Sequence, residues 1–95
     1  MTDMIKFFLE IWEEREHFSE ISQKYLGEEP FTYYFDHLLE KEVYPELKFT
    51  RWNIILLTKD EHEAKTNGFP GEKHKRLIEK AKERYDREKE SSEMD

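Results

Sequence analysis

The sequence lacks cysteine, long apolar runs and an excess of basic side chains. Without cysteine, neither a disulfide framework nor a zinc site with thiolate ligands can form. No run approaches the roughly 20 apolar residues needed to cross a bilayer, and the first residues show no secretory signal. We therefore expect no membrane partner and a cytoplasmic location. The net charge of −7 disfavours nucleic-acid binding by the chain as a whole.

The aromatic content and the distribution of charge are more informative. Aromatic residues make up 15% of the 95 residues, and because each buries a large area they favour a folded chain. The length fits one small domain with a thin core, which we expect over residues 1–90, with residues 91–95 as a disordered tail. Residues 65–89 hold 9 basic and 5 acidic side chains, so a bound nucleic acid is expected along this last third.

Three helices are predicted from apolar periodicity and from helix-end signals. The first covers residues 3–24 and ends in a turn at Gly27 and Pro30. The second begins at a capping box formed by Thr58 and Glu61 and ends near Gly68. The third covers residues 72–89, and its apolar stripe consists of Leu77, Ile78, Ala81 and Tyr85.

Two β-compatible runs, residues 31–35 and 52–57, predict a two-stranded antiparallel sheet. The connection over residues 38–52 is long for a compact domain. Its apolar residues predict a loop packed by its own side chains, namely Leu38, Leu39, Val43, Tyr44 and Leu47. The predicted fold class is therefore α+β.

Asp36-His37, Asn53 and His62 follow one another across this sheet and the helix after it. This order resembles the His-Asn-His signature of the HNH endonucleases, in particular the small phage-encoded ones. The stretches YFDHLLEKEVYPELKF and NIILLTKDEHEAKTNGFP carry the resemblance. It implies a ββα-metal core, made of a hairpin and a short helix, flanked by N-terminal and C-terminal helices. The implied activity is metal-dependent nicking or cutting of DNA phosphodiester bonds with little sequence preference, in the host cytoplasm if the chain is phage-encoded.

The resemblance also implies a role for individual residues. His37 would be the general base, while Asp36 and His62 would hold one divalent cation. Asn53 would hydrogen-bond the loop that carries His37 and keep it in register. Two further residues, Lys65 and Thr66, would lie near the scissile phosphate. Because adjacent strand residues point to opposite faces, Asp36 and His37 can share a cleft only where the strand ends or twists.

Metal-dependent hydrolysis needs a general base and ligands for a cation, and these residue types can supply both. A histidine with a pKa of about 6.5 is partly deprotonated at neutral pH and can therefore act as a general base. One carboxylate and one imidazole suit Mg²⁺ or Mn²⁺, with Ni²⁺ or Zn²⁺ as alternatives. Many relatives hold a structural zinc with cysteine pairs, the second of which would fall at Thr58 and Glu61, so no structural zinc is expected. Some also have a third ligand where Thr66 stands here, which leaves two protein ligands, with Asn67 as a weak candidate for a third.

Simpler interpretations are also open for several of these residues and for the function. Lys73, Lys75 and Arg76 are candidates for DNA contact, but basic residues interleaved with acidic ones are also typical of a solvated helix. The histidines and tryptophans outside the pattern are expected to be structural: His17, His74, Trp12 and Trp52. The alternative function is a non-catalytic module on the same scaffold that binds protein or DNA. The negative charge also suggests a recruiting protein, such as a component of phage packaging or recombination machinery.

Overall fold

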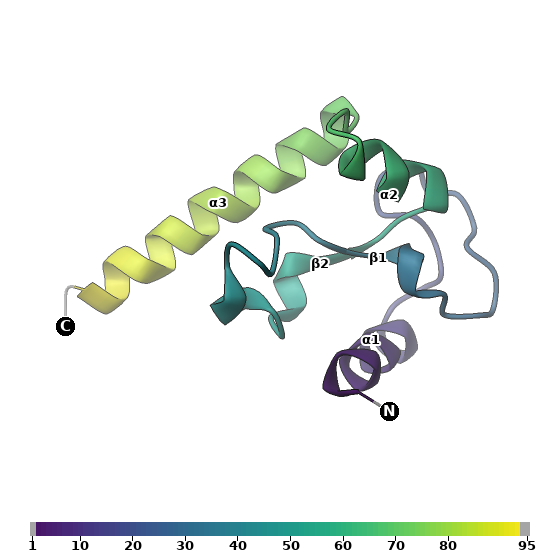
Figure 1. Cartoon of the computed structure of the whole chain (residues 1–95), viewed down its shortest axis with the longest axis horizontal. Coiled ribbons are helices and arrows are strands. Elements are labelled where there is room, and N and C mark those ends of the chain that lie inside the picture. The colour runs from purple at the N-terminus through teal and green to yellow at the C-terminus, as the bar shows by residue number, and fades with distance from the viewer. Residues whose placement is uncertain (1, 94–95) are drawn as a thin grey trace.

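The computed structural model describes residues 2–93, with side chains through residue 90, and shows a small α+β domain. In the described part, three α-helices and a two-stranded antiparallel sheet follow one another along the chain (Figure 1). Their order is α1 (Asp3–Glu14), β1 (Phe35–His37), β2 (Ile54–Leu56), α2 (Lys59–Thr66) and α3 (Glu72–Glu93). None of these helices is both long and apolar enough to cross a membrane.

Helix α1 is shorter than the helix predicted over residues 3–24, because the chain leaves it at Arg15. The backbone of Arg15 is extended, and its guanidinium donates to the carbonyl oxygens of Ile54, at 2.6 Å, and Arg51, at 2.9 Å. Further along, the N–H of Glu20 donates to the Leu56 carbonyl at 2.8 Å, and the Leu56 N–H donates to the Glu20 carboxylate at 2.7 Å. These contacts satisfy the outer edge of β2, so tertiary hydrogen bonding overrides the helical periodicity.

The strands pair as predicted but are only three residues long. Phe35 lies opposite Leu56, Asp36 opposite Ile55 and His37 opposite Ile54. Short 3₁₀ turns, Thr32–Tyr34 and Arg51–Asn53, precede β1 and β2 and take up five of the eleven residues predicted to be extended. The strand pair is therefore a short platform whose main effect is to place Asp36 and His37.

The two faces of the sheet are covered by different helices (Figure 1). On one face, residues of α1 pack with Leu26 and alternate residues of the strands: Phe7, Ile11, Trp12, Phe35, Ile54 and Leu56. On the other face, the predicted stripe of α3 packs against the loop and β2, in a cluster that includes Leu38, Leu39, Leu47, Ile55, Leu57 and Ala81. The loop after β1 is packed as expected except for Val43, which is 65% exposed.

The predicted bounds of α2 are confirmed. Thr58 and Glu61 form the capping box, with each side chain accepting from the other residue's backbone N–H. The helix ends at Thr66, and Gly68 has a φ of 86°, a conformation that suits glycine. Helix α3 is longer than the predicted 72–89, since it continues to Glu93. Residues 91–93 of the predicted tail are thus helical, and residues 94–95 lie outside the described part.

Asn53 fixes the long loop onto the start of β2. Its side chain is fully buried, accepts from the Leu39 N–H at 2.9 Å and donates to the Leu39 carbonyl at 2.9 Å. A weaker contact of 3.5 Å reaches the Leu47 carbonyl. The hydrogen bonds that the sequence predicted for this amide are present, and they hold the chain immediately after His37.

We predict that Asn53→Ala lowers the free energy of unfolding by about 2–4 kcal/mol, because it leaves the buried N–H and C=O of Leu39 without partners. Urea unfolding followed by tryptophan fluorescence measures this change. Asn67→Ala, at the exposed end of α2, is the matched control and should change stability by less than about 0.5 kcal/mol. Equal effects of the two substitutions would contradict a structural role for Asn53.

Candidate active site

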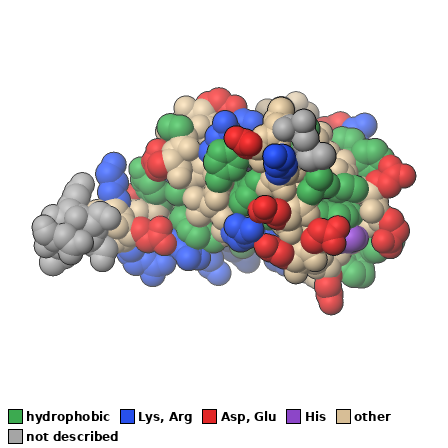
Figure 2. All heavy atoms as spheres, turned by 90° about the horizontal axis from the view of Figure 1, so that it is seen from below, with side chains coloured by type: hydrophobic (Ala, Val, Ile, Leu, Met, Phe, Trp, Pro, Cys, Tyr) green, Lys and Arg blue, Asp and Glu red, His purple; other side chains and the backbone are tan. Residues whose placement is uncertain are grey.

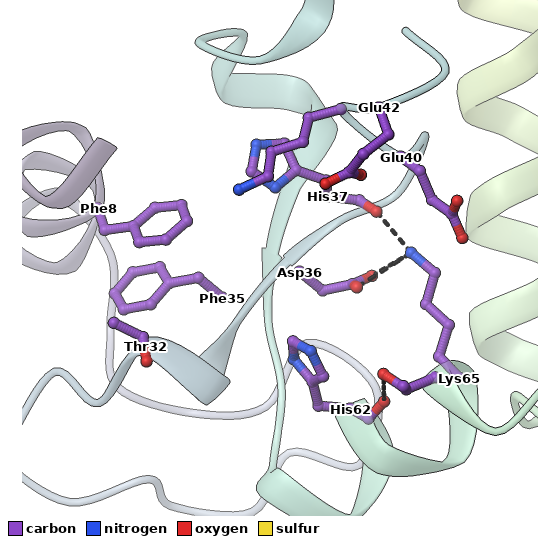
Figure 3. A pocket seen from close by; sticks show the side chains of 11 residues that line it. Phe8, Thr32, Phe35, Asp36, His37, Glu40, Glu42, His62 and Lys65 are labelled. Carbon is purple, nitrogen blue, oxygen red and sulfur yellow. Dashed lines mark hydrogen bonds and ion pairs between the residues drawn. The ribbon is translucent and has the colours of Figure 1, made fainter. Parts of the chain in front are cut away.

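An open cleft of about 570 Å³ lies beside β1 and gathers residues from three distant segments. Asp36 and His37 come from β1, while His62, Lys65 and Thr66 come from α2 (Figure 3). The remaining lining residues are Phe8, Thr32, Phe35, Glu40, Lys41 and Glu42. The structure therefore brings together five of the residues that the sequence singled out.

Asp36 and His37 share this cleft although they point to opposite faces of the strand. We had expected the strand to end or twist at this pair, but both residues lie within β1 and pair with β2. In the described part of the chain no third strand pairs with the outer edge of β1, and the cleft crosses that edge. The ring of His37 lies on the α1 side, 5.9 Å from the ring of Phe8, and Asp36 lies on the side of α2 (Figure 3).

The carboxylate of Asp36 is buried and fully engaged. Its side chain is 6% exposed and receives hydrogen bonds of 3.0 Å from Lys65 Nζ at both oxygens. Lys65 Nζ also donates to the carbonyl oxygens of His37, at 2.5 Å, and Leu38, at 3.3 Å. Four oxygen atoms thus surround the ammonium group, which takes the place that a cation bound to Asp36 would occupy.

His74 is a member of this network that the sequence pattern missed. It was expected to be structural, and it is 1% exposed in the first turn of α3. Its Nε2 lies 2.9 Å from Oδ2 of Asp36. Because an ionised carboxylate only accepts, Nε2 is the donor of this bond. No signal in the linear motif marks His74, since its contact exists only once α3 has packed against β1.

The imidazole of His37 is held in one tautomer. Its Nε2 lies 3.0 Å from the backbone carbonyl oxygen of Lys48, and a carbonyl can only accept. The neutral ring therefore carries its proton on Nε2 and keeps a lone pair on Nδ1. Burial lowers the pKa of His37 below its ordinary value, and the hydrogen bond to Lys48 opposes this shift only in part. The ring is thus predominantly neutral at pH 7, the form that can accept a proton.

His62 lies in the first half of α2 and faces Asp36 across the cleft (Figure 3). Among the side chains that the structure describes, its Nδ1 is a fully buried nitrogen without a hydrogen-bond partner. Such an atom costs free energy unless something binds it. The hydroxyl of Thr66 donates to the His62 carbonyl at 3.1 Å, so Thr66 presents an oxygen that can still accept.

The basic candidates on α3 are not part of this cleft. None of Lys73, Lys75 and Arg76 lines it, and Lys75 lies 3.9 Å from Glu72 in an exposed pair. At about 100° per residue, Lys73 and Arg76 fall on one edge of the helix and Lys75 on the other. Contact of these three residues with DNA stays a prediction.

The chain matches no protein-family model, no curated protein and no solved structure. What the cleft can do therefore follows from its own groups. A neutral imidazole can accept a proton, a carboxylate and a second imidazole can bind a cation, and an ammonium group can bind an anion. Groups of these kinds can serve the hydrolysis of a phosphodiester.

We predict that nitrogen-detected NMR finds His37 protonated on Nε2 in its neutral form, with a pKa below about 6.5, the usual value for histidine. The physical reason is the Lys48 carbonyl acceptor together with burial of the ring. Substituting Lys48 by Ala keeps the carbonyl and should leave the tautomer unchanged. A neutral ring protonated on Nδ1, or a pKa above 6.5, would contradict the proposed state of the base.

Proposed function

We propose that this protein is a divalent-metal-dependent endonuclease of the HNH type that hydrolyses DNA phosphodiester bonds. The observation that supports it best is the convergence of Asp36, His37 and His62, from β1 and α2, on one cleft. The order of hairpin and short helix is also the order that a ββα-metal core requires. The net charge of −7 supports recruitment to DNA by a partner protein.

His37 is the proposed general base. Its Nδ1 carries the free lone pair, and the Lys48 carbonyl stabilises the positive charge that the ring gains when it takes a proton from the attacking water. Asn53 supports this step indirectly, because its hydrogen bonds to Leu39 fix the backbone two residues after the base. Positioning of this kind contributes to catalysis by keeping the base within reach of the water.

Asp36 and His62 are the proposed ligands of the cation. The unpartnered, buried Nδ1 of His62 and the carboxylate of Asp36 are donors that fit a divalent ion in kind. When bound, such an ion stabilises the charge on the phosphate and on the leaving oxygen. Mg²⁺ or Mn²⁺ suits this pair best, with Ni²⁺ or Zn²⁺ as alternatives.

Lys65 and Thr66 are the proposed phosphate contacts. Lys65 must first release Asp36, because its ammonium now bonds to both carboxylate oxygens. Once released, the flexible side chain remains at the wall of the cleft, where it can neutralise a phosphate oxygen. Lys65 would then hold Asp36 in the free protein and the substrate in the complex.

A non-catalytic binding module is the second candidate, and the bonding of Asp36 favours it. Lys65 and His74 already compensate this carboxylate. Within the described part of the chain, no three His, Asp or Glu side chains form a group that could hold a metal ion. In this case the cleft would bind protein or DNA without cleaving it.

We predict that the protein nicks supercoiled plasmid in Mg²⁺ or Mn²⁺ and that His37→Ala reduces the rate by at least about 100-fold, the scale of a lost general base. The rate should rise with pH through an apparent pKa below about 6.5, because only the deprotonated ring accepts a proton. Lys24→Ala, at an exposed residue that does not line the cleft, is the control. Absence of nicking by the folded protein with either metal would favour the binding module instead.

We predict that Lys65→Met binds Mn²⁺ more tightly than the native protein, because the carboxylate of Asp36 loses its competing cation. The same substitution should lower the stability of the metal-free protein by about 3 kcal/mol, since it breaks a buried ion pair. Isothermal titration and the Mn²⁺-dependent rise in the unfolding midpoint measure both effects. Lys6→Met, on the exposed side of α1, is the control, and weaker Mn²⁺ binding by Lys65→Met would contradict the ligand role of Asp36.

A further inference from the structure

A second groove, of about 300 Å³, adjoins the cleft. The two share Glu40 and Lys65 as lining residues. From there the groove runs between the loop after β1 and the side of α3, where Tyr44, Ile78 and Lys82 line it. A chain molecule that enters the cleft can therefore continue past Lys65 toward α3 without crossing the body of the protein.

Contacts of α3 show which of its edges faces this groove. Lys82 lines the groove directly. Lys89 lies 5.7 Å from the ring centroid of Tyr85, and Tyr85 packs edge-to-face on Tyr44. Lys82 and Lys89 are about 20° apart around the helix axis. They thus form one edge, which we call the groove edge.

The far edge of α3 carries three other basic residues, Lys80, Arg84 and Arg87. Lys80 and Arg87 are about 160° around the axis from Lys82 and Lys89, and Arg84 stacks on Trp52, 4.8 Å from the ring centroid. Acidic side chains separate the two edges on the solvent side: Glu79, Glu83 and Asp86. Figure 2 shows Lys and Arg side chains along the lower edge of the molecule beside the C-terminal end of α3.

We propose that the backbone of a DNA strand leaves the cleft through this groove, with Lys82 and Lys89 as its phosphate contacts. The proposal rests on the proposed function and narrows the contact expected along residues 65–89 to Lys82 and Lys89. Charge complementarity supports it, because Lys82 lines a groove that adjoins the cleft and Lys89 lies farther along the same edge of α3, beside Tyr85. The proposal also explains how an acidic protein can bind DNA, because Lys82 and Lys89 concentrate positive charge on one edge of α3.

The test compares two double substitutions with the same charge change at nearly the same height on the helix. Lys82→Gln with Lys89→Gln removes the groove edge, and Lys80→Gln with Arg87→Gln removes the far edge. Binding of the full chain to a short DNA duplex and to one of its single strands is measured in EDTA over a range of salt concentrations. We expect the groove-edge variant to weaken binding about tenfold and to reduce the salt slope by about 1–2, and the far-edge variant to change little.

A further substitution removes a negative charge instead of a positive one. Glu40 lies where the cleft meets the groove and carries the same charge as the phosphate. Glu40→Gln should therefore tighten DNA binding by about threefold, an energy of roughly 0.6 kcal/mol.

Three results would overturn the proposal: equal losses in the two double variants, a larger loss in the far-edge variant, or no measurable binding by the native protein. Absence of nicking together with a selective loss in the groove-edge variant would overturn the nuclease and leave the DNA path standing. Nicking together with equal losses in the two double variants would overturn the DNA path and leave the nuclease standing.

Discussion

The buried carboxylate of Asp36 is the group on which the arrangement of the helices depends. It reaches Lys65 on α2 and His74 on α3, and all three side chains are largely or fully buried. A buried charge is costly unless it is paired and hydrogen-bonded, so neither helix can move away from β1 without a large loss of stability. Two helices are thereby fixed by one side chain. This places His62, one turn before Lys65, beside the same cleft.

The same carboxylate couples stability to the proposed chemistry. Two carboxylate and two carbonyl oxygens surround Nζ of Lys65. Such an oxygen environment also suits a metal ion. The proposed cation and Lys65 would therefore compete for Asp36, and binding of the ion would have to compensate for the lost ion pair. Functional sites commonly contain such conflicts with the most stable arrangement.

Different segments satisfy the two outer edges of the sheet, and the cleft lies along one of them. Arg15 and Glu20 satisfy the backbone groups along the outer edge of β2. Along the outer edge of β1, the carbonyl of His37 bonds to the side chain of Lys65. The cleft lies along this outer edge of β1. Adjacent residues of one strand, Asp36 and His37, can then serve the same cleft from its two faces.

Features that depend on neighbours a few positions apart were predictable from the sequence. The capping box at Thr58 and the apolar stripe of α3 are of this kind, because both follow from the geometry of a single helix. The pairing of the two strands followed from their β-compatible composition. The HNH-like order also identified five residues that line the cleft, although their roles remain proposals.

The sequence by itself thus determined the class of the fold, the second and third helices and the set of polar residues that meet beside β1. Tertiary structure alone decided that α1 ends at Glu14, that His74 bonds to Asp36 and that Lys82 faces the groove. Each of these depends on groups dozens of residues apart in the chain, and no local pattern encodes which of them will meet. Their partners are chosen by the need to satisfy buried charges and strand edges once the helices have packed.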